Sequence, residues 1–333
     1  MVIAFMNNTR KNTSLLDDMR KILRREAYAY STENSYCDWV RRFIKFHGFL
    51  DRESMLVSAV AKVEQFLTFL AVERNVAPST QNQALNALVF CYARVLNFPI
   101  EGVKAARARK EPRIPVVLTK KEVKQVLSTL DGTVGLIVKL LYAGGLRITE
   151  AVRLRVQDID FGFMQITVRD GKGKKDRVTP LAGELVGLLK EQIDRVEVVH
   201  TRDLASGFGC VYLPFALARK YPNADKEFVW QYVFPSRNLA EDPRSDMIRR
   251  HHVDQSVVNK AIKRAVKLCG IHKKVSAHTF RHSFATHLLQ TGTDIRTIQA
   301  LLGHADLQTT MMYTHVLKQG GQGVKSPLDS LYG

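Results

Sequence analysis

Two fragments near the C-terminal end carry most of the information in this chain: Ser276-Ala-His-Thr-Phe-Arg-His-Ser-Phe-Ala-Thr-His-Leu-Leu289 and Leu301-Leu-Gly-His-Ala-Asp-Leu-Gln-Thr-Thr-Met-Met-Tyr-Thr-His315. Between them they hold an arginine, several imidazoles and a phenol at short, regular separations, among many apolar residues. Such a set suits an anion better than a cation. We therefore expect a helical anion-binding cage with Tyr313 at its edge.

The first fragment has two helical faces. His278 and Arg281 are spaced i, i+3 and so leave one face, whereas Phe280, Phe284 and His287 group on another, which we expect to be buried. His287 is therefore predicted to be a packed core histidine. His282 is assigned a structural role as well.

A metal site is the alternative for the same helix. His278 and His282 are spaced i, i+4, as in metal-binding pairs. However, no Glu follows His278 in an HExxH arrangement, and Arg281 would repel a cation. We expect neither a metal nor another cofactor.

The charge of the whole chain also points to an anionic partner. Its 333 residues carry 50 Lys+Arg and 32 Asp+Glu, a net charge of +18. Residues 1–110 hold 17 Lys+Arg against 10 Asp+Glu, or +7, which leaves +11 for the remainder. An excess spread over both halves is typical of two domains that grip one polyanion.

The four cysteines form no CxxC pair, and no run of about 18 apolar residues occurs. This pattern indicates a soluble, cytoplasmic protein without disulfides.

Residues 13–97 are predicted to form four helices, starting after Ser14, near 32, near 58 and at Pro78. Regular helices with short joins favour a compact bundle. Arg41 and Arg42, on the polar side of the second helix, are candidate phosphate contacts, although either one alone could be only solvated. The first domain is assigned to residues 1–102.

Residues 103–118 contain five basic residues and two prolines, which favours an extended linker that can follow a phosphate backbone. Thr119 and Glu122 form a capping-box pattern at the start of a second domain, 119–316. Residues 317–333 remain as a tail.

The second domain adds two more cationic groups. Arg147 follows a Gly-Gly stop and begins a short helix, with Glu150 at i+3 as an alternative ion-pair partner. Residues 163–169 and 176–181 alternate as two strands joined by a glycine- and lysine-rich hairpin that contains Lys172 and Lys174.

Residues 182–277 are predicted to be the least regular stretch. They hold aromatic residues among prolines and cations, a composition that favours stacking on exposed bases. For Trp230 the alternative is an aromatic mini-core that braces a long insertion.

Tyr313 is the candidate nucleophile of the cage. With a pKa of about 10, only ~0.1% of a tyrosine is ionised at pH 7, so it needs a base or a cationic field. We expect the cage to supply both.

The ordered set resembles the tyrosine recombinase (phage integrase) family. The family's motif positions are occupied here by Arg147 in G-L-R-I-T-E, Lys172 in a G-K-G hairpin, His278 and Arg281 in H-x-x-R-H, His304 in L-G-H, and Tyr313. The resemblance covers about residues 10–320. It implies a mainly α fold with a small antiparallel sheet, built as a two-domain, C-shaped DNA clamp.

The resemblance also implies a mechanism. Tyr313 attacks the scissile phosphate to form a 3′-phosphotyrosine, while Arg147, Arg281 and His304 hold the phosphate oxygens. His278 assists proton transfer, and Lys172 is the candidate general acid, with Lys174 or Lys175 as substitutes. Neither metal nor ATP is required, and two DNA sites imply a homo-tetramer.

Within that family the chain is most similar to integron integrases, through an insertion around residues 200–252. By this resemblance Trp230, Pro243, His251 and His252 are candidates for gripping extrahelical bases of a folded single-stranded attC hairpin, alongside duplex attI sites. The implied setting is the bacterial nucleoid, and the tail 317–333 is a candidate for exchange between protomers. The alternatives are a recombinase of duplex sites, a tyrosine topoisomerase, or a DNA-binding protein without chemistry.

Overall fold

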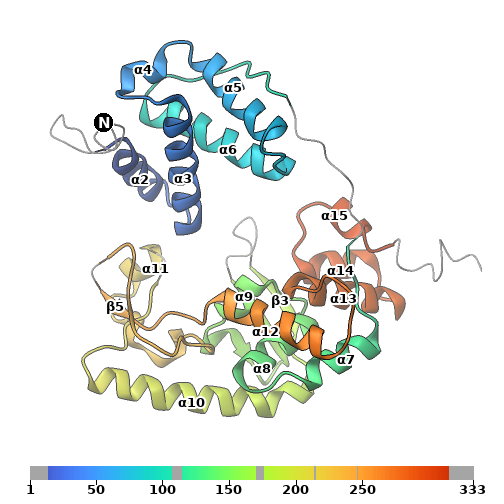
Figure 1. The fold of residues 1–333 in the computed structure, drawn as a ribbon. Coiled ribbons are helices and arrows are strands. Elements are labelled where there is room, and N and C mark those ends of the chain that lie inside the picture. Colours follow the sequence, from blue (N-terminus) through green and yellow to red (C-terminus); the bar gives the residue numbers. More distant parts are fainter. Residues whose placement is uncertain (1–13, 107–114, 170–175, 214, 246, 315–333) are drawn as a thin grey trace, which may run out of the picture. The chain divides into compact units, whose positions relative to one another are not determined.

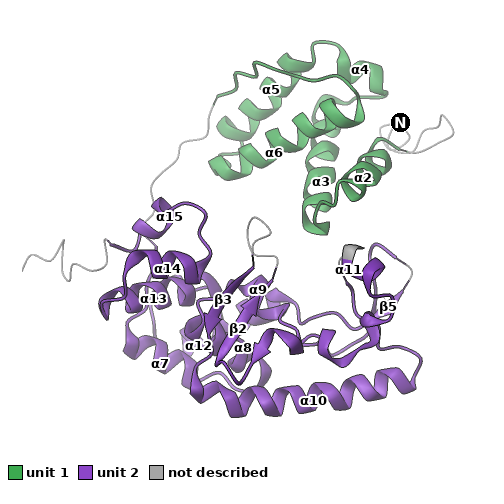
Figure 2. Cartoon of the chain, turned by 180° about the vertical axis from the view of Figure 1, so that it is seen from behind, with its two compact units in different colours: residues 1–113 green, residues 114–333 purple. Residues whose placement is uncertain are grey.

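The structure, a computed structural model, describes residues 14–106, 115–169, 176–213, 215–245 and 247–314. The chain divides into two compact units, residues 1–113 and 114–333 (Figure 2). The division falls inside the basic segment expected to be a linker, of which residues 107–114 lie outside the described part.

Unit 1 is a bundle of helices around one apolar core. Its elements are α2 (Leu15–Arg25), α3 (Tyr30–His47), the short α4 (Arg52–Leu56), α5 (Ala59–Val72), α6 (Pro78–Phe90) and the π-helical turn η1 (Cys91–Val95) that ends α6. Local signals set their ends: Ser14 accepts a hydrogen bond from the Asp17 amide, and Gly48 ends α3 at φ +66°. The four expected helices are thus present, and the short α4 is an addition.

Unit 2 is built around the apolar helix α8 (Gly132–Ala143), in which Ile137, Leu140 and Leu141 are fully buried. A helix that is apolar on most sides belongs in the middle of a domain. Its neighbours are α9 (Ile148–Val152), α10 (Val186–Ala205), α12 (Gln255–Leu268) and α13 (Ala277–Gln290). The unit is completed by α7 (Lys120–Ser128), α11 (Phe215–Lys220), α14 (Ile295–Leu302), α15 (Gln308–Met311) and the 3-10 turns η2 (Val156–Asp158), η3 (Gly183–Leu185), η4 (Ala224–Lys226) and η5 (Phe228–Trp230) (Figure 1).

The sheet of unit 2 is small and antiparallel, in the order β1 (Ile159–Asp160), β2 (Gln165–Val168), β3 (Arg177–Pro180). In the β2–β3 pair, Ile166 lies opposite Thr179 and Val168 opposite Arg177. A two-stranded ribbon, β4 (Ala240–Glu241) and β5 (Ile248–Arg249), stands apart. The expected fold class, mainly helical with a small antiparallel sheet, is confirmed.

The prediction that residues 182–277 are the least regular stretch is wrong for their first part. Val186–Ala205 forms α10, a helix of 20 residues that buries Leu189 and Val196. These two residues are spaced i, i+7 and lie on one helical face. Figure 1 shows α10 extending from the region of α8 toward α11 and β5, so it carries the insertion on a rigid support.

None of the helices in the described ranges combines the length and the apolar character needed to cross a bilayer.

Candidate active site

The turn between α8 and α9 presents Arg147. Gly145 adopts φ +59°, and a Cβ built there would lie 2.4 Å from Cδ1 of Phe284, so only glycine fits this position. The turn makes Arg147 the first residue before α9, with its side chain 19% exposed. The cation therefore stands at a helix start with part of its guanidinium open to solvent.

Glu150 is the shared counter-ion of the site. Its carboxylate accepts from the Arg147 backbone amide (2.7 Å) and from Nη1 of Arg147 (2.6 Å). Arg177 of β3 donates to both carboxylate oxygens, at 2.9 and 2.6 Å. The ion pair between Arg147 and Glu150 considered from the sequence thus exists, but it is one part of a larger network.

Burial alone would raise the pKa of Glu150. Hydrogen bonds from Arg177 and from the Arg147 backbone, with the charge of Arg177, outweigh burial and lower that pKa to about 2. Glu150 is therefore ionised throughout the physiological range and holds the two arginines in place.

Arg281 reaches into the same network from α13 and is 3% exposed. Its Nη1 donates to the carbonyl of Gly145 at 2.6 Å, and its Nη2 donates to the carbonyl of Leu302. Nη1 also lies 3.8 Å from the Glu150 carboxylate. These contacts tie the α8–α9 turn, α13 and the end of α14 to one guanidinium.

His304 follows the αL residue Gly303 that ends α14. Its Nε2 lies 3.2 Å from Nη2 of Arg281, and its Nδ1 lies 3.0 Å from Oγ1 of Thr310. Because a guanidinium can only donate, Nε2 is the acceptor and Nδ1 carries the proton that binds Thr310. Burial, followed by the charges of Arg281 and Arg147, lowers the pKa of His304 to about 4, in agreement with this neutral form.

Tyr313 was expected at the edge of the cage. The structure instead buries its side chain, which is 1% exposed. Its ring packs in a small core with Phe284, Ile298 and Leu302, and stacks at 6.4 Å on the ring of His304. The physical reason is that the phenol ring is mostly apolar surface, and the turn after α15 directs it into the gap between α13 and α14.

The Tyr313 hydroxyl contacts a residue that was predicted from the sequence to be structural. Nδ1 of His282 lies 2.9 Å from Oη of Tyr313. Burial raises the pKa of Tyr313, and the charges of Arg281 and Arg147 lower it only in part. The cationic field expected from the sequence is therefore present, but burial outweighs its effect on the pKa of Tyr313 in this structure.

The remaining candidates take different positions. His278 is exposed, with its ring centroid 6.4 Å from that of His282. His287 is buried and bonded to the hydroxyl of Tyr142 at 2.9 Å, in keeping with a packed histidine. Lys172 and Lys174, with Lys175, lie outside the described residues. Among the described residues, no three His, Cys, Asp or Glu side chains form a group that could hold a metal ion.

The arrangement thus gathers two arginines, three histidines and a tyrosine from α9, α13 and the α14–α15 segment. Arg177 and Thr310, which the motifs in the sequence did not reveal, support it from behind. A strand signal could have pointed to Arg177, because it precedes the buried Thr179 by two residues and shares its face. Such a set of donors can hold a phosphodiester next to a hydroxyl nucleophile.

A second polar region lies in the insertion. Arg155 donates to the backbone carbonyl of Tyr212 at 2.7 Å, and its Cζ lies 4.8 Å from the ring centroid of Tyr232 and 5.8 Å from that of Trp230. Trp230 is half-buried, as the mini-core alternative expected, and packs beside this cation. Arg155 therefore braces two aromatic rings, which the sequence did not reveal.

Of the other predicted base-contacting residues, His252 contacts one of these rings. His252 is half-buried edge-on to Tyr232 at 5.3 Å, and its Nδ1 bonds to the carbonyl of Val253. Pro243 is exposed. His251 has a buried Nε2 with no hydrogen-bond partner among the described residues.

In unit 1, Arg41 and Arg42 both pair with Asp38, at 3.4 and 2.8 Å. Arg42 also lies over the ring of Trp39, 4.8 Å from its centroid. Both side chains stay partly exposed, so these surface pairs are weak and leave the guanidiniums open to phosphates.

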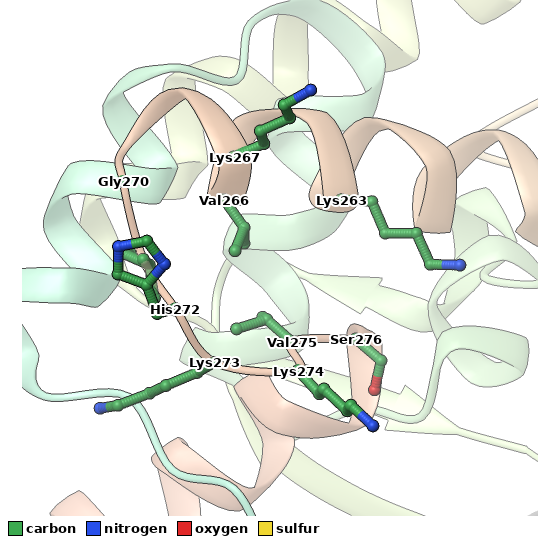
Figure 3. A pocket seen from close by; sticks show the side chains of 10 residues that line it. Lys263, Val266, Lys267, Gly270, His272, Lys273, Lys274, Val275 and Ser276 are labelled. Carbon is green, nitrogen blue, oxygen red and sulfur yellow. The ribbon is translucent and has the colours of Figure 1, made fainter.

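A basic cleft of about 590 Å³ lies between the end of α12 and the start of α13. Figure 3 shows Lys263, Lys267 and Lys274 projecting around it, with Ser276 at one end. Ser276 is the N-cap residue of α13, two positions before His278. Lys273, also in the lining, pairs with Glu122 at 2.6 Å. The cleft therefore offers positive charge beside the start of α13, the helix that carries His278 and Arg281.

Comparison with known proteins agrees with this chemistry. The sequence model of the Phage integrase family matches residues 116–320, and that of the Phage integrase, N-terminal SAM-like domain matches residues 15–101. An "Integrase/recombinase" of Escherichia coli is 46% identical over 322 residues, covering 96% of this chain and 95% of the relative. Tyrosine recombinase XerA of Thermococcus onnurineus is 32% identical over 308 residues, covering 91% and 90%.

Two solved structures share the fold. XerH site-specific recombinase bound to difH substrate, in a pre-cleavage complex, aligns with a TM-score of 0.57 at 19% identity over 89% of this chain and 79% of that one. The Tn1549 transposon integrase in complex with transposon right end DNA aligns with a TM-score of 0.56 at 16% identity, over 96% and 97%.

Proposed function

The chain belongs to the phage integrase family and is a tyrosine site-specific DNA recombinase that acts through a phosphotyrosine intermediate, and from this premise we propose that it captures and excises gene cassettes. Its proposed substrates are duplex attI sites and attC sites folded from single-stranded DNA. The proposal of a folded single-stranded substrate rests on one observation: Arg155 lies against the rings of Trp230 and Tyr232 in the insertion.

In the proposed reaction Arg147 and Arg281 hold the non-bridging oxygens of the scissile phosphate. Arginine forks suit those oxygens, because they donate two hydrogen bonds with a full positive charge. Tyr313 attacks and forms the 3′-phosphotyrosyl link, and Lys172 protonates the leaving 5′-oxygen. Because the covalent link retains the energy of the broken bond, no ATP is needed, and the arginines bind the phosphate oxygens without a metal ion.

The imidazoles assist this step. We assign His304 to a phosphate oxygen, which requires its Nε2 to exchange the hydrogen bond from Arg281 for a proton of its own. A bound phosphate favours that exchange, since its negative charge raises the pKa of a nearby imidazole. His278, exposed at the start of α13, assists proton transfer at the rim. The buried Tyr313 hydroxyl has to become accessible to the phosphate when DNA binds.

The insertion is proposed to read extrahelical bases. A base that stacks on the open side of Trp230 would gain about 1–3 kcal/mol. His251 offers the buried Nε2 that has no partner among the described residues, His252 lies edge-on to Tyr232, and Pro243 is exposed. Such contacts distinguish a folded single strand, whose bases are turned out, from a continuous duplex.

We propose that both units contact the sugar-phosphate backbone of the DNA, as in a C-shaped clamp. Arg41 and Arg42 in the first domain (residues 1–102), Lys174 in the catalytic domain (119–316) and the lysines of the basic cleft supply the charge. Two DNA sites are held by four protomers, with residues 317–333 exchanged between neighbours. The proposed setting is the bacterial cytoplasm, at the nucleoid.

A cleavage assay tests both levels of the proposal. The protein is incubated with a nicked attC hairpin and with a nicked duplex of equal length, and covalent adducts are separated on a denaturing gel. We expect an adduct with the parent chain and none with Tyr313→Phe. If the parent chain forms no covalent adduct with the hairpin and none with the duplex, the assigned catalytic residues are contradicted.

The base-reading proposal is tested by binding. Trp230→Ala should weaken binding of the hairpin by about 10-fold or more and leave the duplex unchanged. Tyr221→Ala, which removes an exposed aromatic side chain from the same insertion, serves as the control. Equal losses on both DNAs, or no loss at all, would leave the chain a recombinase of duplex sites.

A further inference from the structure

The hydroxyl of the nucleophile is held by one side chain. Oη of Tyr313 lies 2.9 Å from Nδ1 of His282, and within the described part of the chain this is the hydrogen bond that the hydroxyl makes. Both groups are largely enclosed, with Tyr313 1% exposed and His282 half-buried. Without this partner the phenol would be left with an unsatisfied hydroxyl in a buried position, which is unfavourable.

The direction of this hydrogen bond follows from the charges around it. Burial, followed by the nearby His278 and Arg281, lowers the pKa of His282 to about 4, so its ring is neutral at pH 7. Burial raises the pKa of Tyr313, so the phenol keeps its proton. The phenol therefore donates to Nδ1, and the ring proton of His282 sits on Nε2.

The other groups of the cage cannot take the same proton in this arrangement. Arg147 and Arg281 are donors only. His304 has its Nε2 occupied by Arg281 and its Nδ1 by Thr310, at 3.2 and 3.0 Å. His278 is exposed and, among the described residues, makes no hydrogen bond to Tyr313.

We propose that His282 is a catalytic residue of this recombinase: the general base that takes the Tyr313 proton during cleavage and returns it during rejoining. The inference rests on the proposed function, in which Tyr313 attacks a DNA phosphate. It changes the assignment of proton transfer at the nucleophile from His278 to His282.

Bonds and protons balance in this step. The bond from Oη to phosphorus forms as the bond from phosphorus to the 5′-oxygen breaks, and the proton moves from Oη to Nδ1. The 5′-oxygen leaves with a proton from the general acid. In rejoining, the 5′-hydroxyl attacks, the bond from phosphorus to Oη breaks, and Nδ1 returns its proton to the phenolate.

The charges around His282 suit this role only when DNA is bound. The groups that face its ring are His278 and Arg281 on the same helix, Tyr313 after α15, and His304 from the α14–α15 turn. With no phosphate present, these cationic and neutral groups keep Nδ1 free of a proton. A phosphate that pairs with Arg281 reduces the positive field and so raises the proton affinity of the imidazole.

His282→Asn separates positioning from base catalysis. The Asn side-chain oxygen can occupy the place of Nδ1 and accept the hydrogen bond, but it cannot take a proton. We expect the first-order rate of adduct formation to fall by about 100-fold or more, and to rise tenfold per pH unit up to pH 9, as ionised Tyr313 becomes the reactive form. His282→Ala should be partly rescued by added imidazole.

A substrate with a bridging sulfur in place of the 5′-oxygen separates loss of the general acid from loss of the general base. The cleavage rate of this substrate would not distinguish the variants if His282 only supported the fold. The thiolate leaves without protonation, so the sulfur should restore the rate of Lys172→Ala but not that of His282→Asn. His287→Asn, five residues later on α13 and buried, is the control for packing: it should lower stability and leave the pH dependence of cleavage unchanged.

The outcomes are distinct. If the parent chain forms no adduct, the proposed function fails and this inference fails with it. If the parent chain cleaves and folded His282→Asn cleaves within about threefold of it, or is restored by the sulfur substrate, then only the assignment of His282 is overturned.

Discussion

Arg177 and Glu150 form a two-point ion pair beneath the arginine cage: Nη1 of Arg177 lies 2.9 Å from one carboxylate oxygen and Nη2 lies 2.6 Å from the other. Both side chains are almost fully buried. Nε of Arg177 also donates to the carbonyl of Leu301 at 2.8 Å, in the turn that leads to His304. Arg177 thus joins β3, α9 and the end of α14, and the position of the phosphate-binding groups depends on a residue behind them.

Replacing Arg177 should therefore affect both stability and cleavage. Arg177→Met keeps the apolar stem but leaves Glu150 buried with one partner fewer, which should lower the free energy of unfolding by about 3 kcal/mol. Urea unfolding at pH 7 measures it. Arg20→Met, which breaks the exposed pair with Asp17, should cost less than about 1 kcal/mol. If both variants lose a similarly small free energy of unfolding, the buried Arg177–Glu150 pair does not stabilise the fold.

Glu150 should make the stability depend on pH in acid. Its folded pKa of about 2 lies below the unfolded value of 4.5, so the carboxylate stabilises the fold above pH 4.5, and this contribution disappears as the pH falls toward 2. Glu150→Gln should cost on the order of 3 kcal/mol at pH 7, and the difference from the parent chain should narrow at pH 3. Urea midpoints at both pH values test this, and an equal gap at both would refute it.

Gly145 should tolerate no side chain. It combines φ +59° with a Cβ position 2.4 Å from Phe284, and its carbonyl anchors Arg281. Gly145→Ala should lose several kcal/mol of stability and most of the cleavage rate. Gly270→Ala, at φ +66° with nothing within 4 Å of its Cβ, should show only the left-handed backbone cost of about 1–2 kcal/mol. Thermal unfolding of the two variants isolates the clash.

Thr310 should orient His304. The Thr310 side chain is fully buried and its Oγ1 lies 3.0 Å from Nδ1 of His304. Thr310→Val keeps the shape but leaves Nδ1 without its partner, a loss of about 1–3 kcal/mol in fixing the ring, so cleavage should slow about tenfold or more. Thr310→Ser, which keeps the hydroxyl, should retain most of the rate. Equal rates for the two variants would speak against this role.

The basic cleft should contribute to DNA affinity through charge alone. Combined Lys263→Ala, Lys267→Ala and Lys274→Ala should weaken binding of hairpin and duplex alike. The slope of log K against log salt should fall by about 0.7–0.9 for each DNA phosphate that a lysine no longer neutralises. Binding measured at several salt concentrations gives the slope. Lys190→Ala, an exposed lysine on α10, is the control and should leave it unchanged; an unchanged slope in the triple variant would remove the cleft from the DNA interface.

The helices and the sheet could be predicted because their signals are local. Ser14, Pro78 and the Thr119–Glu122 capping box mark helix starts within three or four residues of the groups they bind. The missed helix α10 shows the limit of local signals, because its buried face includes Gln192, Leu189 and Val196 rather than an apolar stripe. Because several residues of its buried face are polar, the composition of α10 is similar to that of a surface segment, and the helix was not predicted.

By itself the sequence determined which reactive groups this protein has and in what order they follow, since Arg147, His278, Arg281, His304 and Tyr313 stand in short motifs of fixed spacing. Only the tertiary structure decided how they are paired. Tyr313 meets His282 across 31 residues, and Arg177 meets Glu150 across 27. Such contacts depend on how α9, α13 and α14 pack around the sheet, and local spacing carries no information about that packing. Burial, which sets the pKa of His282 and Tyr313, is likewise a property of the packed core.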